Sequence, residues 1–160
     1  MLHKEWFCGK DCLDVGSHQG VLTLAIVTEF TPRSMTGVEI DETLCKKAQG
    51  LRSQLVRKYK GTTKVVVSLR KTQFWNGDFL AMETVQEASV DVVTCLSVAK
   101  WIHFHHGDAG MQRLFSRFWT ILRLNGLLLF EPQSLRSYRQ AMKKLVSALP
   151  SMAVLSQDAF

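Results

Sequence analysis

The sequence predicts a doubly wound α/β domain with a mostly parallel sheet, and three observations indicate it. Short apolar runs of strand length alternate with longer amphipathic runs of helix length. Two of the apolar runs, VVTCLS and LLLF, are hydrophobic at nearly every position, which is typical of parallel strands covered on both faces. The first apolar run ends in a glycine turn that leads directly into a helical run, as in a β-α-β unit.

The elements are expected in the following order. Strands are predicted at residues 11–15, 35–40, 73–76, 91–97 and 126–131, and helices at 19–30, 42–59, 108–122 and 134–148. Asp41 and Glu42 are typical of a helix N-terminus, where negative charge is favourable. Asn125-Gly126 is typical of a turn from helix to strand. The stretch VVVSLR at 65–70 fits a short extra strand or a basic connection, and the sequence leaves both open.

Length and composition predict one domain over residues 1–160. The 160 residues are 46% hydrophobic, enough for one sizeable core. No apolar run approaches the 18 or so residues of a membrane span, and MLHKEWFCGK lacks the apolar centre of a signal peptide. The four cysteines form no C-x-x-C pair. We therefore expect an intracellular soluble protein with reduced thiols, no metal site and no membrane contact.

The turn in DCLDVGSHQG predicts a cofactor site. Gly16 and Gly20 allow backbone N–H groups and a helix N-terminus to approach a ligand closely. A dinucleotide would bring a pyrophosphate, which the carboxylate of Asp14 would repel. S-adenosylmethionine instead brings an ammonium and a sulfonium, so the charge favours it. The alternative is an ordinary packing turn, because Gly-x-x-x-Gly alone is a weak signal.

Two later strand ends add acids to this site. Glu39 lies 19 residues beyond Gly20, the spacing expected of a ribose-binding acid in a β-α-β unit. Asp78 and Phe79 follow the next strand, where an acid can accept from the adenine amino group and an aromatic ring can cover the base. Asp78 also fits a simple turn residue after Asn76-Gly77.

The segment VVTCLSVAKWIHFHHG predicts an anion site. An apolar strand is followed by Lys100, Trp101, His103, His105 and His106, and ligands of open α/β sheets bind beyond strand carboxyl ends. The alternative is a solvated surface with Trp101 in the core.

Charge predicts a polyanionic partner. The net charge is +6. Residues 43–77 contain nine lysines and arginines and no acidic residue; the next acid is Asp78. A second basic set comprises Arg113, Arg117, Arg123, Arg136, Arg139, Lys143 and Lys144. Nucleic acid is the expected partner, although such helix faces are often only solvated.

The motifs LDVGSHQG, GVEID, NGDF, CLSVAKWIHFHHGDAG and LFEPQSLRSY together resemble the bicoid-interacting protein family of RNA 5′-phosphate methyltransferases. The likeness covers about residues 4–145 and leaves 146–160 unassigned. The glycine and acidic motifs are common to most class I methyltransferases. The block K-W-I-H-x-x-x-G-D followed by E-P-Q is specific, and it carries the resemblance.

The resemblance implies a class I, Rossmann-like methyltransferase fold, S-adenosyl-L-methionine as cofactor, and a 5′-phosphorylated small RNA as substrate. It favours the nucleus over the cytoplasm. The implied cofactor-binding residues are Asp14, Gly16, Ser17, Gly20, Glu39, Ile40, Asp78, Phe79, Leu96 and Ser97. The residues implied to face the RNA end are Lys100, Trp101, His103, Glu131 and Gln133, with Lys100 and His103 as the catalytic pair that clamps the phosphate.

The chain also departs from the family. Ser17-His18-Gln19-Gly20 stands where the family usually has Cys-Asn-x-Gly, and His105 stands where it usually has Asn. A Tyr- and Arg-containing segment that folds over the substrate, and the last strands of the sheet, are expected to be missing from these 160 residues. Two alternatives therefore stay open: an inactive RNA-binding module of the same fold, or a methyltransferase with a small-molecule or protein substrate.

Overall fold

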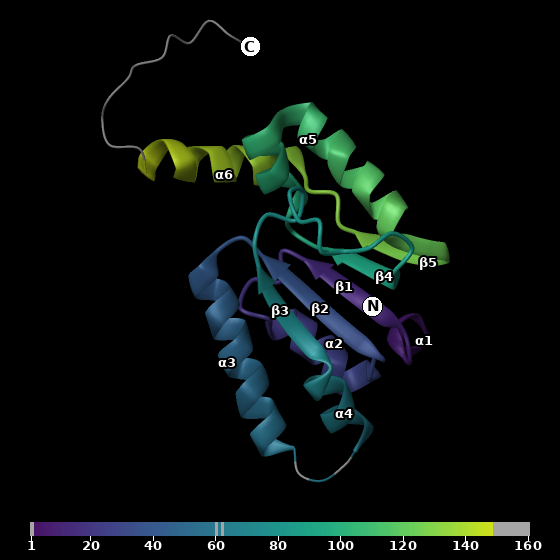
Figure 1. Ribbon diagram of the computed structural model, residues 1–160. Coiled ribbons are helices and arrows are strands. Elements are labelled where there is room, and N and C mark those ends of the chain that lie inside the picture. The colour runs from purple at the N-terminus through teal and green to yellow at the C-terminus, as the bar shows by residue number, and fades with distance from the viewer. Residues whose placement is uncertain (1, 60, 62, 149–160) are drawn as a thin grey trace, which may run out of the picture.

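The computed structural model describes residues 2–59, 61 and 63–148, and its centre is a five-stranded parallel sheet (Figure 1). The strand order is β3-β2-β1-β4-β5, and every neighbouring pair is parallel. The strands are β1 (Asp11–Val15), β2 (Ser34–Glu39), β3 (Thr72–Asn76), β4 (Val90–Cys95) and β5 (Leu122–Phe130). This arrangement confirms the predicted fold class.

β1 occupies the middle of the sheet. It pairs with β2 from Asp11↔Ser34 to Val15↔Val38, and with β4 from Cys12↔Val92 to Asp14↔Thr94. The order of the strands reverses between β1 and β4, so the connections that leave their carboxyl ends diverge and open a crevice. That crevice is the expected place for a ligand.

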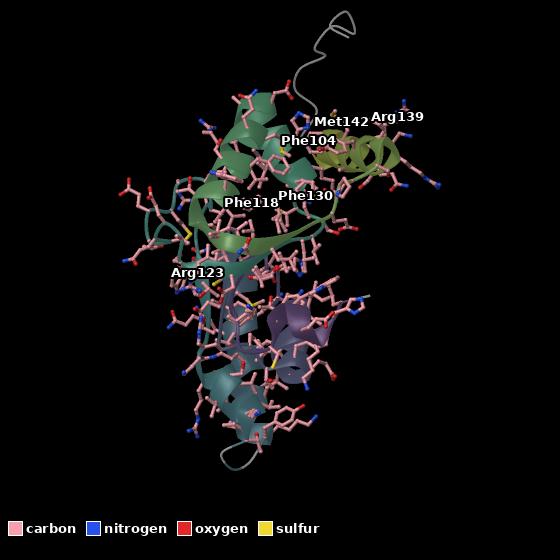
Figure 2. All side chains as sticks on the ribbon, turned by 90° about the vertical axis from the view of Figure 1, so that its right-hand side faces the viewer. Phe104, Phe118, Arg123, Phe130, Arg139 and Met142 are labelled. Atoms are coloured by element: carbon pink, nitrogen blue, oxygen red, sulfur yellow. The ribbon has the colours of Figure 1, made fainter. Side chains whose placement is uncertain are left out.

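Helices cover both faces of the sheet. α1 (Lys4–Phe7), α2 (Val21–Phe30), α3 (Glu42–Lys58) and α4 (Lys64–Arg70) pack on one face, around a core that includes Phe7, Leu24, Ile26, Met35 and Leu69. α5 (Ala99–Ile121) packs on the other face, and Figure 2 shows Phe118 between that helix and the sheet. α6 (Leu135–Ala148) lies beside the first turns of α5 (Figure 1).

The stretch 65–70 is helical, so neither interpretation of VVVSLR was right. Thr63 caps α4 by accepting the N–H of Val66 at 3.3 Å. Val66 and Leu69, three positions apart, are buried on one side of the helix. Burial at helical spacing therefore outweighs the strand preference of three consecutive valines.

The helix predicted at 108–122 begins earlier, at Ala99. Gly107, with φ 60° and ψ −163°, kinks it and separates the segment 99–106 from the longer part. Residues 99–106, which were predicted to follow the strand without a helix of their own, therefore lie on a helix. Their side chains follow helical rather than alternating directions.

The prediction that Asn125-Gly126 forms the turn before the last strand was also wrong. β5 begins at Leu122, directly after α5, and contains both residues. Asn125 has φ 63°, and the pairing with β4 shifts register between Val90 and Val92. The pair thus forms a bulge inside a strand, the other structure that such residues favour.

The described residues include only part of the chain end for which predictions were made. Within the described residues the sheet has five strands and α6 is the last element. Residues 149–160 of the unassigned tail lie outside that range. None of the described helices is long and apolar enough to cross a membrane.

Candidate active site

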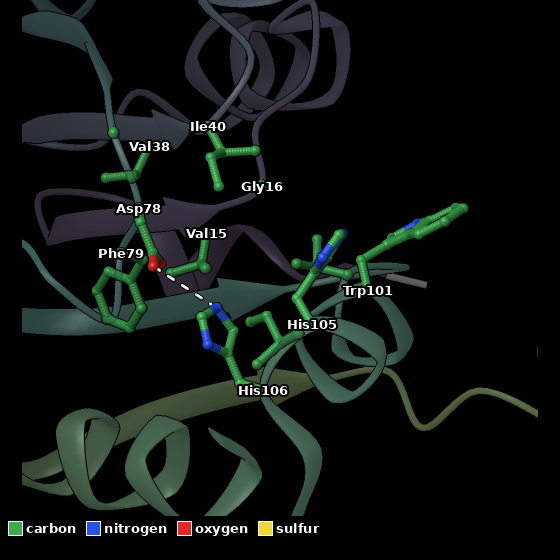
Figure 3. A pocket seen from close by; sticks show the side chains of 12 residues that line it. Val15, Gly16, Val38, Ile40, Asp78, Phe79, Trp101, His105 and His106 are labelled. Atoms are coloured by element: carbon green, nitrogen blue, oxygen red, sulfur yellow. Dashed lines mark ion pairs between the residues drawn. The ribbon is translucent and has the colours of Figure 1, made fainter. Parts of the chain in front are cut away.

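Two adjoining cavities lie at the carboxyl ends of the strands, and Gly16 borders both. The larger, of about 510 Å³, will be called the adenine-side cavity; it is lined by Val15, Gly16, Val38, Ile40, Gly77, Asp78, Phe79, Val98, Trp101, Ile102, His105 and His106 (Figure 3). The smaller, of about 420 Å³, will be called the turn cavity; it is lined by Asp14, Gly16, Ser17, His18, Gln19, Val21, Leu22, Ala25, Leu96 and Ser97. Both lie at the crevice that the strand order predicts.

The glycine turn shapes the wall between the two cavities. Gly16 has φ 76°, and a Cβ built on it would lie 2.2 Å from Cγ2 of Val98, so no larger residue fits there. The N–H groups of Gly16 and Ser17 both donate to the carbonyl of Val38, at 2.8 and 3.0 Å. The turn after β1 is therefore held against the end of β2.

Asp14 is a buried carboxyl group at the floor of the turn cavity. Its Oδ1 accepts the hydroxyl of Thr94 at 2.6 Å, and its Oδ2 accepts the hydroxyl of Thr23 at 2.5 Å. Burial raises the pKa of Asp14, and the two hydroxyl donors oppose that rise. The group is thus satisfied by neutral donors, and its ionised form would gain from a nearby cation.

Glu39 lies at the end of β2 and is 7% exposed. One carboxylate oxygen accepts the N–H of His18 at 2.8 Å, and the other accepts the N–H of Asp41 at 3.0 Å. These two contacts fix the carboxylate beside the glycine turn. Each oxygen keeps acceptor capacity, so the group can still accept the hydroxyls of a sugar.

Ile40, Asp78 and Phe79 lie together around the adenine-side cavity, as the sequence predicted (Figure 3). Oδ1 of Asp78 accepts the N–H of Leu80 at 2.9 Å, so Asp78 serves as a turn residue, the alternative interpretation of this position. Its Oδ2 lies 3.7 Å from Nε2 of His106. Phe79 is buried, with its ring centroid 5.7 Å from that of Phe118.

Ser17, Leu96 and Ser97 line the turn cavity, also as predicted. The Oγ of Ser17 is buried and has no hydrogen-bond partner among the described residues. A buried hydroxyl without a partner costs free energy, and a polar ligand in this cavity would satisfy it. Ser97 donates to Glu131 at 2.6 Å, which ties the segment after β4 to the end of β5.

The residues predicted to face the RNA end gather where α5 meets α6. The backbone N–H of Lys100 donates to Gln133 at 3.0 Å, and its Nζ donates to Ser137 at 2.9 Å. The Nδ1 of His103 lies 3.2 Å from the hydroxyl of Tyr138. These contacts hold the first turns of α5 against α6.

Lys100 and His103 do not line the adenine-side cavity. Lys100 borders a separate hollow of about 450 Å³, which is also lined by Trp101, Ser137, Gln140, Ala141 and Lys143. Trp101, 39% exposed, borders both spaces and so connects them. From the predicted segment, Trp101, His105 and His106 line the adenine-side cavity, whereas Lys100 and His103, the predicted catalytic pair, do not.

Some residues at the site were not among those predicted to bind the cofactor or the RNA end, although His106 was predicted as part of the anion site. His106 and Val98 line the adenine-side cavity, His18 lines the turn cavity, and Tyr138 contacts His103. The signal for His106 was present as helical spacing, because positions 102, 105 and 106 share a helix face with 98 and 101. Because the predicted helix began only at residue 108, this shared helix face was not expected.

The predicted basic surface is divided. Arg52, Arg57 and Arg70 surround a hollow of about 300 Å³ at the start of β3, away from the carboxyl ends of the strands. Arg136 and Arg139 are exposed on α6, which contacts the first turns of α5, and Figure 2 shows Arg139 on that helix. Of the second basic set, Arg136 and Arg139 lie on α6 beside the site, whereas Arg123 pairs with Asp11 and Asp91 at the amino ends of the strands.

The comparisons with known proteins agree with this site. Residues 90–155 match the family described as Bicoid-interacting protein 3 (Bin3), which confirms the predicted resemblance. The chain is 31% identical to the "Probable RNA methyltransferase" of Arabidopsis thaliana, over 86% of this chain and 54% of that protein. It is 33% identical to the "U6 snRNA methylphosphate capping enzyme Amus" of Drosophila melanogaster (86% and 46%) and 30% to the human "7SK snRNA methylphosphate capping enzyme" (86% and 27%).

The chain thus spans about half the length, or less, of these curated relatives. Solved structures resemble it in fold. A putative sarcosine dimethylglycine methyltransferase from Galdieria sulphuraria superposes with a TM-score of 0.62 at 14% identity, covering 89% of this chain and 47% of that one. A methyltransferase from Thiobacillus denitrificans gives 0.57 at 18%, covering 87% and 50%. The fold is that of class I methyltransferases.

Proposed function

We propose that this relative of the Bin3 family acts in S-adenosylmethionine-dependent methylation of the 5′-terminal phosphate of a small RNA. One observation carries the proposal. At the carboxyl end of the sheet, Asp14, Glu39 and Asp78 form no ion pair with any lysine or arginine of the described residues. A cluster of uncompensated carboxylates beside a helix with exposed cations suits a cationic cofactor and an anionic substrate.

The residues present fit the cofactor. Asp14 and the orphaned hydroxyl of Ser17 would hold the methionine part in the turn cavity, together with Gly16, Leu96 and Ser97. Gly20, also predicted for this role, does not line the cavity: a Cβ built on it would meet Phe74 and Ala48. Glu39 would accept the ribose hydroxyls. Ile40, Asp78 and Phe79 would hold the adenine. The cofactor supplies a methyl group made electrophilic by its sulfonium.

The protein's own contribution is placement. A terminal phosphate has a second pKa of about 6, so its oxygens are already nucleophilic at neutral pH and no strong general base is required. Lys100 and His103 would hold this phosphate, and Trp101, Glu131 and Gln133 would line its approach. Positioned in this way, a bimolecular displacement becomes effectively intramolecular.

The relatives' names support the substrate and the compartment. Two of them are named for the capping of small nuclear RNAs, U6 and 7SK, with a methylphosphate. A small 5′-phosphorylated RNA is therefore the proposed substrate, and the nucleus the proposed compartment. The exposed Arg136 and Arg139 on α6 would contact the RNA chain beyond its end.

The decisive experiment is methyl incorporation into one RNA in phosphorylated and dephosphorylated form, with parallel calorimetry of S-adenosylhomocysteine. The parent should methylate only the phosphorylated RNA. Lys100→Ala and His103→Ala should each lower turnover roughly tenfold to hundredfold, the effect of one charge-assisted contact, with cofactor affinity nearly unchanged. Lys10→Ala, an exposed lysine just before β1, is the control.

Two results would contradict the proposal. Equal incorporation into both RNAs would identify a base or ribose as the target. Cofactor binding without incorporation into either RNA would favour the inactive RNA-binding module.

A further inference from the structure

His106 was predicted only as part of an anion site, yet it lines the adenine-side cavity. It projects from α5 toward Asp78 and Phe79 on the loop after β3 (Figure 3). The side chains of His106 and Asp78 are each about one-third exposed, at 32% and 33%. They face each other across the cavity, and the pair joins two segments that are 28 residues apart in the chain.

The backbone around His106 holds the imidazole in this position. Gly107 ends the first segment of α5 with non-helical φ and ψ angles of 60° and −163°. A Cβ built on Gly110 would lie 2.2 Å from the Cβ of His106, an overlap that a regular helix would not produce. Two glycines therefore permit the kink that directs His106 into the cavity.

The two carboxylate oxygens of Asp78 have different neighbours. The N–H of Leu80 donates to Oδ1 at 2.9 Å, which is a contact internal to the loop. Oδ2 faces Nε2 of His106 at 3.7 Å, and this is the only ion pair recorded for Asp78 among the described residues. The imidazole is thus the neighbour that keeps this oxygen directed into the cavity.

We propose that His106 is a positioning residue for purine recognition: it orients Asp78 so that the carboxylate accepts the 6-amino group of the cofactor's adenine. This inference rests on the proposed function. A carboxylate only accepts hydrogen bonds, so it favours a 6-amino donor and disfavours a 6-oxo acceptor. Without the imidazole, the side chain of Asp78 is free to turn away, and both affinity and discrimination fall.

The test compares S-adenosylhomocysteine with S-inosylhomocysteine, its 6-oxo analogue, by calorimetry. The parent should prefer the amino compound by roughly tenfold or more, because the 6-oxo group cannot donate a hydrogen bond to the carboxylate of Asp78. Asp78→Asn should remove most of this preference, since an amide can also donate. His106→Phe keeps a ring at the cavity wall but no polar contact. It should lose roughly three- to tenfold in affinity for the amino compound, together with most of the discrimination.

Two further variants separate positioning from packing. His106→Gln keeps a polar N–H group facing Oδ2 of Asp78 and should retain affinity within roughly threefold of the parent, if this polar contact is the main contribution. His3→Phe makes the same change at an exposed site before α1 and should change nothing. Thermal unfolding of each variant confirms that the fold is intact.

The inference is overturned if His106→Phe and His106→Gln both match the parent, or if the discrimination survives in His106→Phe. It is also overturned if Asp78→Asn keeps the parent's preference. A parent that binds neither compound overturns the proposed function itself. The two failures are therefore distinct.

Discussion

The two ends of β1 carry acids of the same type in opposite electrostatic settings. At the amino end, Asp11 forms ion pairs with Arg33 and with Arg123, the latter at 3.0 Å. Asp91 at the start of β4 pairs with the same two arginines, at 3.3 and 3.0 Å. At the carboxyl end, Asp14 receives only hydroxyl groups and Glu39 only backbone N–H groups.

The pKa values follow this difference. Hydrogen bonding from Arg33 holds the pKa of Asp11 well below its usual range. Burial works to raise the pKa of Asp91, but the N–H of Asp11 and the guanidinium of Arg123 bring it below its usual value. Burial raises the pKa of Asp14. At the amino end, arginines therefore balance the negative charge of the acids and stabilise the fold. At the carboxyl end, the acids have no lysine or arginine partner among the described residues. This costs stability, as is common at binding sites.

The largest expected difference between the two ends concerns glycine. Gly9→Ala, before β1, meets no atom within 4 Å, so only the left-handed φ of 70° opposes it, at about 1–2 kcal/mol. Gly16→Ala, after β1, adds the overlap with Val98 and should cost about 2–5 kcal/mol in the free energy of unfolding. Urea denaturation measures both. Equal losses would mean that Val98 moves aside and that the turn is not tightly constrained.

The next effect separates binding from stability along one strand. Asp14→Asn should weaken S-adenosylhomocysteine binding roughly tenfold to hundredfold, because a charged acceptor is lost. Its stability at neutral pH should not fall, because burial disfavours the charge of Asp14. Asp11→Asn should do the reverse, with a lower unfolding temperature and unchanged affinity. Calorimetry and thermal unfolding of the two variants test the contrast, which fails if both lose the same property.

The free energy of unfolding should depend on pH in opposite directions for the acids at the two ends of β1. The lowered pKa values of Asp11 and Asp91 add stability above about pH 4, the ordinary Asp value, and this stability is lost as the pH falls through their folded-state values. The raised pKa of Asp14 lowers stability at neutral pH, and that penalty is relieved as the pH falls toward 4. Asp11→Asn should reduce the loss of stability at low pH. Asp14→Asn should remove the rise in stability that occurs before this loss as the pH falls. Unfolding midpoints between pH 7 and 2 would show whether the rise and the later loss of stability respond separately to the two substitutions.

The smallest expected effect is on the salt dependence of RNA binding, which should differ between basic residues on α6 and on α3. Neutralising Arg136 and Arg139, beside the site, should lower the slope of log affinity against log salt by about 0.7 per lost contact for a single strand. Neutralising Arg57 and Lys58, in the last turn of α3, should lower it less, because these residues lie nearer the amino ends of the strands. Filter binding at several salt concentrations measures both slopes. A larger change from α3 would restore residues 43–77 as the main RNA surface.

Much of the fold and the cofactor site could be predicted because strand ends are local features. A buried strand followed by Gly16, Glu39 or Asp78 places that residue at one edge of a parallel sheet, whatever the intervening helices do. Asp41 capped α3 as expected, accepting the N–H of Leu44 at 3.0 Å. The individual roles of these residues stay predictions until a ligand is measured.

The errors came where a residue type fits two structures. Three valines formed a helix at α4 because Val66 and Leu69 could be buried together there. Asn125-Gly126 formed a bulge instead of a turn because α5 passes directly into β5. His106 was expected at an anion site rather than at the adenine-side cavity, because no local sequence signal predicts the kink at Gly107.

By itself, the sequence determined the α/β order, the acids at the strand ends and the family likeness, since these depend on hydrophobic periodicity and short motifs read along the chain. Only the tertiary structure decided which charges are compensated. Asp11 and Asp14 are three residues apart and chemically identical, yet Arg33 and Arg123 reach the first and neither pairs with the second. Those partners lie 22 and 112 residues away in sequence, and only the packed sheet brings them to Asp11.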